Sequence, residues 1–370
     1  MLPVLDTLTE DHAAVYDRQL RVWGVEVQRR LIEAKVLIIG LGGLAAEIAK
    51  NIVLAGVGTV ALVDDTAASS AAPGNFLVEP EASAGKSVAE ASAVTLQAMN
   101  PLIAVRVERG PPSASALLSP AGLQPEGGAT DQVGPQVSDS PGGPTAEDLR
   151  SLVSRYDTVV ACGLPLREVA ALDDLCRQLG KQLFAGEVRG ASSFAFVDLG
   201  PRHVYTVKGD PEEKVAEYRS FREVMKADLK NVNKRTHPLY LTLRACWEFE
   251  EAHCRPAGGP ADVAEVQAFA QRLTSATPAG NTAAAMKALI PEALVEGFVL
   301  DGAAVAPGSA PDQVQEAAQP LGELAPVCAV VGGAVANNVL RAVSHCNPPL
   351  RNFFCYSYLA RDGLGVEECF

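Results

Sequence analysis

The sequence is poor in features that mark several common classes of protein. Aromatic residues make up 5% of its 370 residues, lysine and arginine (31) are outnumbered by aspartate and glutamate (44), and no run of about 18 apolar residues occurs. The net charge of −13 argues against binding to bulk nucleic acid or to an anionic membrane, and the missing apolar run argues against a membrane span. Residues 1–12 are mixed and acidic, unlike a signal peptide, so we expect an intracellular protein.

Cysteine is present, but not in the pattern of the usual metal sites. The chain has eight cysteines, and no two of them form a Cys-x-x-Cys pair. That pair is typical of zinc sites, so we expect no metal site. In an intracellular chain the thiols are expected to be reduced and mostly buried. Cys162 follows a predicted strand, where a nucleophile could stand, but no histidine lies near it in the sequence, which argues against catalysis by this thiol.

One stretch has the pattern of a nucleotide-binding βαβ unit. Residues 35–40 form an apolar run that ends in glycine and favours a buried parallel strand. A glycine-rich turn at 40–45 then opens a helix that extends to about residue 54, and residues 59–63 predict a second strand. Glycines in such a turn let backbone N–H groups approach a phosphate, and the N-terminus of the following helix favours negative charge.

Four residues of this unit are candidates for nucleotide contacts. Gly40, Gly42 and Gly43 stand in the turn, and Asp64 closes the second strand at the position of a ribose-binding acid. The motif is weak by itself, because Ala45 stands where a third glycine would be expected. The alternatives are that the glycines serve the tight turn and that Asp64 is a vestige of a lost site.

A basic helical segment precedes this unit. Residues 7–34 have apolar side chains at helical spacing, with Asp11 as a candidate cap and Trp23 as a candidate core residue. Arg18 and Arg21 help to make the segment basic within an acidic protein. They either form a solvated helix face or serve a phosphate, in this chain or in a neighbour.

The remaining pattern predicts an α/β protein with two additions. Strands are expected at 103–107, 158–163, 182–185, 193–199 and 352–356, and helices at 85–99, 146–154, 166–179 and up to about residue 343 after the segment 326–333. Residues 110–144 are rich in proline, glycine, serine and alanine and predict a disordered insertion. The segments 212–230, 237–253 and 261–298 predict an inserted helical subdomain.

Three motifs together resemble one family. Tyr-Asp-Arg-Gln-x-Arg-x-Trp-Gly at 16–24, the glycine turn, and Pro-Val-Cys-Ala-Val-Val-Gly-Gly at 326–333 with Asn-Phe-Phe at 352–354 are similar to the small subunits of SUMO-activating enzymes, in the ThiF superfamily. The resemblance implies a Rossmann-like, ThiF-type adenylation fold with a mainly parallel sheet. It divides the chain into 1–205 (with the insertion at about 110–145), a helical insertion and loop at 206–320, and 321–370, which completes the fold.

The resemblance also implies how the protein works. Such subunits pair with a related catalytic subunit, which binds ATP and Mg²⁺, adenylates SUMO, takes it as a thioester and passes it to a SUMO-conjugating enzyme. Arg18 matches the arginine that the small subunit donates in trans to ATP on the catalytic subunit. Arg21 is open between a similar contact and a salt bridge with Asp17. The implied location is the nucleus, with the cytoplasm as a second one.

Two departures from the active members of the superfamily argue against adenylation by this chain alone. Gly74 stands where the arginine of the Asn-x-Asn-Arg-Gln-Phe motif would be, and Val88 stands where the lysine of Gly-x-x-Lys-Ala would be. Both missing cations would neutralise a triphosphate. Lys86, two residues earlier, is a candidate substitute. We therefore expect ATP and Mg²⁺ to be bound mainly by the partner.

Three other functions remain as alternatives. The first is a self-sufficient ThiF-like adenylating homodimer, against which the missing cations and zinc cysteines argue. The second is the equivalent subunit for another ubiquitin-like modifier. The third is an NAD-dependent oxidoreductase, which the βαβ unit alone would permit. That last reading gives no role to the motifs at 16–24 and 326–333.

Overall fold

The computed structural model describes residues 8–110, 113–118, 145–229, 236–275, 290–302, 322–357 and 366–368. Its strands are β1 (Lys35–Ile39), β2 (Thr59–Val63), β3 (Ala104–Val107), β4 (Thr158–Cys162), β5 (Gln182–Arg189), β6 (Ser192–Asp198), β7 (His203–Val207), β8 (Asp210–Ala216), β9 (Asn352–Ser357) and β10 (Val366–Glu368). Within the described residues, eight of these form one sheet in the order β10-β9-β6-β5-β4-β1-β2-β3, while β7 and β8 form a separate hairpin.

Five neighbouring strands, β5, β4, β1, β2 and β3, run parallel. Strands β6, β9 and β10 continue the sheet in antiparallel pairs. The predicted α/β fold with a mainly parallel sheet is therefore confirmed. The antiparallel direction of β6, β9 and β10 was not predicted, because strand direction depends on pairings between residues far apart in the chain.

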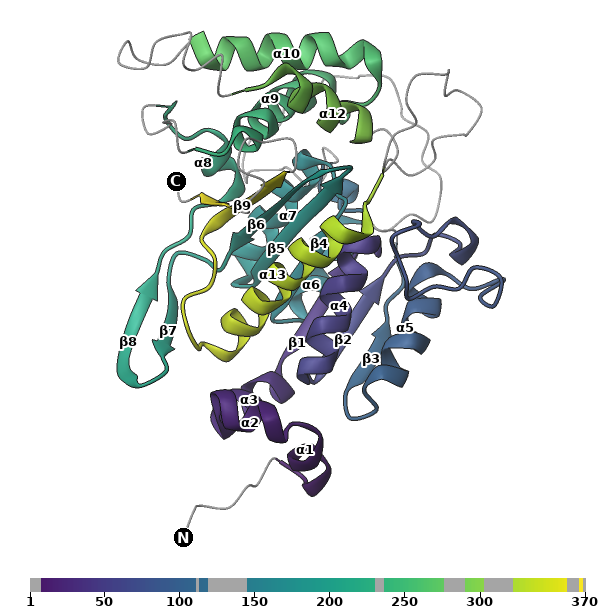
Figure 1. Cartoon of the computed structure of the whole chain (residues 1–370), viewed down its shortest axis with the longest axis vertical. Coiled ribbons are helices and arrows are strands. Elements are labelled where there is room, and N and C mark those ends of the chain that lie inside the picture. The colour runs from purple at the N-terminus through teal and green to yellow at the C-terminus, as the bar shows by residue number, and fades with distance from the viewer. Residues whose placement is uncertain are drawn as a thin grey trace, which may run out of the picture.

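Helices cover both faces of this sheet. They are α1 (Glu10–Val15), α2 (Asp17–Trp23), α3 (Val25–Glu33), α4 (Gly43–Ala55), α5 (Val88–Met99), α6 (Ala146–Ser154), α7 (Leu166–Leu179), α8 (Phe221–Met225), α9 (Pro238–His253), α10 (Pro260–Ser275), α12 (Glu292–Gly302) and α13 (Ala325–Ser344), with 3-10 turns η1 (Ala68–Ser70) and η2 (Ser115–Leu118). Figure 1 shows α1–α3 at one end of the molecule and α9, α10 and α12 at the opposite end.

The alternation of β1 explains the two layers. Val36 and Ile38 belong to the hydrophobic cluster that includes α4, α5 and α13, while Leu37 and Ile39 belong to the cluster that includes α6, α7 and α9. Successive side chains of a strand point to opposite faces, so a continuous apolar run is what a strand covered on both sides requires. The glycine turn thus follows directly on a strand whose last four residues are buried.

Helices α13 and α4 pack closely on the same face (Figure 1). A Cβ atom on Gly332 of α13 would lie 2.6 Å from the Cβ of Glu47 of α4, so glycine is needed there. By length and composition α13 is apolar enough to cross a membrane, and 56% of its most apolar window is buried inside the protein. Its apolar character therefore has an explanation in core packing.

Several local predictions were wrong in type or extent. The helix predicted from residue 212 is replaced by the hairpin β7–β8, and the helix α8 that follows covers only Phe221–Met225. The hairpin turns at Gly209, whose φ of +86° favours glycine. The charged composition of this segment suits a helix and an exposed hairpin equally well. Pairing of β7 with β8 decided the outcome.

Part of the predicted disordered insertion is ordered. Residues 113–118 contain η2, and the N–H of Ala114, which is fully buried, donates to the Glu168 carboxylate of α7 at 2.6 Å. The prediction is therefore wrong for this part, because a distant carboxylate anchors it. Residues 111–112 and 119–144 lie outside the described residues.

The single helical segment predicted at 7–34 is three helices. Thr9, not Asp11, caps the first, and its hydroxyl accepts from the N–H of His12 at 3.2 Å. The chain breaks at Tyr16 and again at Gly24, whose φ is +89°.

A buried carboxylate in α9 makes stability depend on pH. One carboxylate oxygen of Glu250 accepts from the N–H of Arg167 at 3.0 Å, and the other has no hydrogen-bond partner among the described residues. Burial in α9 raises the pKa of Glu250 to about 7. The folded state therefore binds this proton more tightly than the unfolded state does.

We expect the chain to lose stability at Glu250 as pH rises. Because the folded pKa exceeds the unfolded value, stability is highest below the unfolded pKa and falls as pH rises through about 7. Relative to a Glu250→Gln variant, the wild type should lose about 2 kcal/mol of unfolding free energy between pH 5 and pH 8. Urea unfolding of both proteins at the two pH values measures this difference. Parallel pH profiles would contradict it.

Candidate functional site

The glycine turn lies between β1 and α4, as predicted, and is tied to the end of β2. The N–H of Gly40 donates to the carbonyl of Val63 at 3.1 Å, and the N–H of Leu41 donates to the Asp64 carboxylate at 2.9 Å. Gly40 has a φ of +78°, so this position requires glycine for its conformation. The turn stands where the strand order reverses, between β1 and β4, the usual ligand position of such sheets.

Asp64 is engaged by its own chain. It is buried, and besides Leu41 its carboxylate accepts from the N–H of Thr66 at 3.1 Å and from the Thr66 hydroxyl at 2.5 Å. The bond from Leu41 ties the turn to the end of β2, and the two bonds from Thr66 fix the carboxylate in place. In this arrangement the carboxylate supports the turn.

The N-terminus of α4 contacts a residue that the sequence reasoning missed. The carboxylate of Glu323 accepts from the N–H of Gly43 at 2.5 Å and from the N–H of Leu44 at 3.3 Å. A Cβ atom on Gly42 would collide with the same carboxylate. The only signal in the sequence was an acidic residue just before the segment 326–333. That residue could equally have interacted with the N-terminus of the helix that it precedes.

The turn at 72–75 closes the site from another side. A Cβ atom on Gly43 would lie 2.9 Å from the backbone carbonyl of Gly74, and the side-chain amide of Asn75 donates to the carbonyl of Leu41 at 2.7 Å. Gly74 stands at the position where the resemblance implies an arginine in active members of the superfamily. Here a glycine backbone packs directly on the turn.

Neither residue 88, where active members would have a lysine, nor its candidate substitute Lys86 brings a cation to the glycine turn. Val88 is buried at the start of α5. Lys86 is exposed, and it lines a surface hollow with Asp65 and Ser87. Among the described residues that hydrogen-bond to the turn, two are carboxylates and none is a lysine or arginine. A triphosphate would meet negative charge here, so the residues present do not fit ATP.

Cys162 ends β4 beside this turn and is buried. Burial raises the pKa of its thiol well above the usual value, and the nearby Glu323 and Cys328 raise it further. The thiol is therefore protonated at neutral pH and is a poor nucleophile.

The predicted arginine segment is anchored at the opposite end of α4. Tyr16 is buried, and its hydroxyl accepts from the side chain of Asn100 at 2.8 Å. The side chain of Gln19 donates to the carbonyl of Leu54 at 3.2 Å, close to the C-terminal end of α4. Since α4 has 13 residues, roughly 20 Å of helix separates this anchor from the glycine turn.

Trp23 has a structural role. Its indole N–H donates to the side chain of Gln28 at 3.2 Å, and Gln28 is buried and donates to the carbonyl of Ala55 at 3.1 Å. These bonds join α2 and α3 to the end of α4. The ring packs against the hydrophobic cluster below it, as expected for a core residue.

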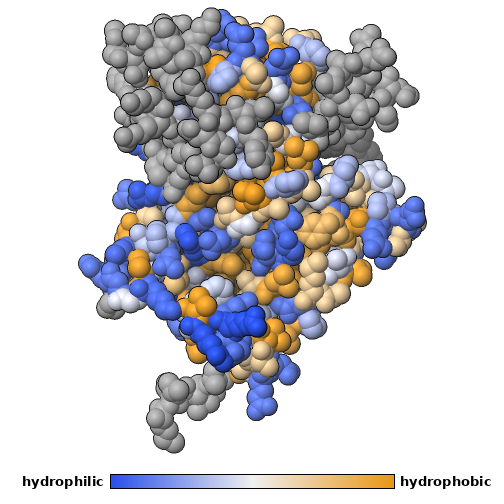
Figure 2. All heavy atoms as spheres, in the orientation of Figure 1, coloured by the Kyte–Doolittle hydropathy of each residue, from blue (hydrophilic) through white to orange (hydrophobic). Residues whose placement is uncertain are grey.

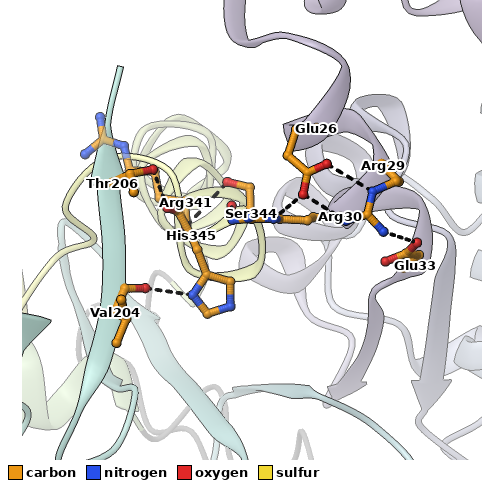
Figure 3. Close-up of polar contacts among 9 residues, drawn as sticks. All are labelled: Glu26, Arg29, Arg30, Glu33, Val204, Thr206, Arg341, Ser344 and His345. Carbon is orange, nitrogen blue, oxygen red and sulfur yellow. Dashed lines mark hydrogen bonds and ion pairs between the residues drawn. The ribbon is translucent and has the colours of Figure 1, made fainter. Parts of the chain in front are cut away.

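Most arginines of this segment are paired within the chain. Figure 3 shows Arg29 between Glu26 and Glu33, and Arg30 bonded to Glu26 and to the carbonyl of Ser344 at the end of α13. The same view shows His345 bonded to the carbonyl of Val204 in β7, so the end of α13 also holds the hairpin.

Arg18 differs from these residues. Arg21 forms an exposed ion pair with Asp17 at 2.9 Å, which is the structural alternative considered for it. Arg18 is exposed, and its side chain makes no hydrogen bond or ion pair with any described residue. It extends from a well-anchored helix, so it presents a positive charge to whatever binds there. The geometry separates it from the chain's own glycine turn.

Comparison with known proteins places this arrangement in a family. The ThiF family profile matches residues 16–364. SUMO-activating enzyme subunit 1A of Arabidopsis thaliana is 33% identical over 98% of this chain and 97% of its own length, and SUMO-activating enzyme subunit 1 of Homo sapiens is 27% identical over 98% and 96%. The crystal structure of PaaA shares the fold, with a TM-score of 0.52 and 16% identity, covering 99% of this chain and 85% of that one. The resemblance inferred from the motifs is thus confirmed. The chain belongs to the ThiF family.

Proposed function

We propose that the chain is the small, regulatory subunit of a heterodimeric SUMO-activating enzyme. It pairs with a catalytic subunit that binds ATP and Mg²⁺, and it supports the adenylation of SUMO, the formation of the thioester and the transfer to a conjugating enzyme. The relatives that match over nearly their whole length support this proposal by their names. The nucleus, and also the cytoplasm, is the proposed location.

One observation carries the proposal: Arg18 is an exposed arginine, unpaired among the described residues, on a helix anchored at the end of α4 opposite to the glycine turn. Tyr16 and Gln19 fix this helix at the C-terminal end of α4, while the glycine turn lies at the N-terminal end. An arginine so placed can serve only a phosphate held outside this chain's turn. We therefore assign Arg18 to ATP bound on the partner, where its guanidinium neutralises charge as the bond between the α- and β-phosphates breaks.

The surface supports the presence of a partner. Figure 2 shows apolar residues gathered on the face that α13 and α4 form in Figure 1. Leu54, Phe76 and Val330 are 46–48% exposed on and beside these helices, and Val15 and Val22 are exposed on the segment that carries Arg18. Large apolar side chains left exposed together mark protein interfaces.

The geometry favours none of the alternatives. A self-sufficient adenylating homodimer needs cations at the turn, where this chain has carboxylates. An NAD-dependent oxidoreductase needs Asp64 for the ribose, but that carboxylate holds the turn. Only an experiment can distinguish the proposed SUMO-specific subunit from an equivalent subunit for another modifier.

Reconstitution tests the proposal directly. The purified chain alone should show no ATP–pyrophosphate exchange dependent on a modifier, and exchange should begin when a catalytic subunit and SUMO are added. Parallel mixtures with other ubiquitin-like modifiers serve as controls for the identity of the modifier. Robust exchange without any partner would overturn the proposal, and charging of a different modifier would reassign the subunit.

A further inference from the structure

The glycine turn already holds an anion that belongs to the chain. The two N–H groups at the start of α4 that would approach a phosphate donate instead to the carboxylate of Glu323. We propose that Glu323 takes the place of a nucleotide phosphate and keeps this half of the assembly closed to nucleotides. This proposal does not depend on the identity of the partner or of the modifier.

The backbone around Glu323 fixes the carboxylate in place. The N–H of Gly190, in the turn between β5 and β6, donates to the carbonyl of Gly322 at 2.7 Å, and Gly190 also forms a β-bridge with Glu323. Two residues after Glu323, α13 begins at Ala325. The side chain is thus held between the sheet and a long packed helix, so it behaves as part of the fold.

The space around the carboxylate is already filled. A Cβ on Gly42 would collide with the carboxylate, and the backbone of Gly74 packs on Gly43 and lies close to the backbone of Glu323. A phosphate could bind the amides only by displacing the carboxylate. Because both groups are anions, they cannot share the site, and binding must be competitive.

The charge of Glu323 acts on its surroundings. Burial raises the pKa of Glu323 above its usual value, although the bonds from Gly43 and Leu44 partly oppose this shift. The same carboxylate contributes to the raised pKa of Cys162, at the end of β4 on the other side of the strand reversal. Because it is bonded to the turn at the strand reversal between β1 and β4, the carboxylate lies where ligands of such sheets bind.

Chemical rescue by a small carboxylate tests whether an anion site exists. The full chain is prepared as wild type, Glu323→Ala and Glu81→Ala, the last removing an exposed acid elsewhere on the surface. At constant pH and ionic strength, replacing chloride with formate should raise the unfolding midpoint of Glu323→Ala by about 2 °C or more. The wild type and Glu81→Ala should not respond. An equal response in all three proteins, or none in Glu323→Ala, would overturn the proposal.

Calorimetry with inorganic pyrophosphate and with ADP tests the exclusion of nucleotides. Glu323→Ala should bind both at least about tenfold more tightly than the wild type, since the competing carboxylate is gone. Wild-type binding as tight as that of the variant would contradict exclusion by Glu323. If the alanine variant fails to fold, Glu323→Gln keeps the side-chain volume and removes the charge. Its pyrophosphate affinity should rise by a smaller factor, and unchanged affinity would count against the proposal.

Discussion

Arg18→Ala should slow SUMO-dependent ATP–pyrophosphate exchange of the reconstituted heterodimer by on the order of 100-fold or more. The guanidinium is proposed to neutralise charge on ATP held by the partner, and an arginine supplied in trans acts mainly in the transition state. Arg18 makes no hydrogen bond or ion pair with the described residues, so its removal should leave folding unchanged. Exchange kinetics measure the effect, and size-exclusion chromatography checks that the heterodimer still forms.

Two further variants separate a specific contact from general charge. Arg21→Ala removes a cation three residues away that is already paired with Asp17 on the surface, so the exchange rate should change little. Arg18→Lys keeps the charge but loses the planar fork, and its rate should lie between those of Arg18→Ala and the wild type. Equal losses in Arg18→Ala and Arg21→Ala would point to long-range electrostatics instead of a contact. A normal rate in Arg18→Ala would remove Arg18 from the site.

Local pattern was enough to predict the central unit of the fold. The strand at 35–39, the helix that ends before Gly56 and the strand at 59–63 each contain their own signals: a continuous apolar run, a glycine turn and a left-handed glycine at the end of the helix. Where residues far apart in the chain decided the structure, the prediction was wrong. Hairpin β7–β8 depends on pairing across Gly209, and η2 depends on Glu168 more than 50 residues away.

In the candidate site, too, features set by local sequence were predictable and features set by distant contacts were not. The positions of Gly40 and Asp64 in the turn and at the end of β2 follow from the βαβ pattern, and the structure places them there. Glu323 reaches the turn across 280 residues, and no spacing rule connects the two. Likewise, Arg18 lies only 22 residues before Gly40 in the sequence, yet the packing of Tyr16 turns it to the far end of α4. Closeness along the chain was therefore misleading for Arg18 and absent for Glu323.

The contact between Tyr16 and Gly56 connects the fold to the proposed chemistry. Gly56 ends α4 with a φ of +88°, and a Cβ atom there would lie 2.6 Å from the Tyr16 ring and 2.8 Å from the side chain of Gln28. Both side chains hold the segment that carries Arg18. Glycine at 56 thus lets the segment approach the helix end closely enough to be fixed.

Gly56→Ala should therefore reduce exchange as much as Arg18→Ala does, on the order of 100-fold, although residue 56 is not proposed to touch ATP. The added methyl would displace Tyr16 and with it the helix of Arg18. Gly180→Ala is the matched control, because Gly180 also ends a helix, α7, with a φ of +65° but has open space around it. Both alanines cost about 1 kcal/mol of backbone strain, whereas Gly56→Ala adds roughly 1–3 kcal/mol from the collision.

The double variant tests whether Gly56 acts through Arg18. If the only catalytic role of the anchor is to place Arg18, then Gly56→Ala combined with Arg18→Ala should be no slower than either single variant, since both remove the same interaction. Exchange rates of the four heterodimers form the cycle, with assembly checked for each. Losses that multiply would mean that Gly56 supports catalysis by a separate route, such as the interface itself. Coincident losses would show that Gly56 supports catalysis by positioning Arg18.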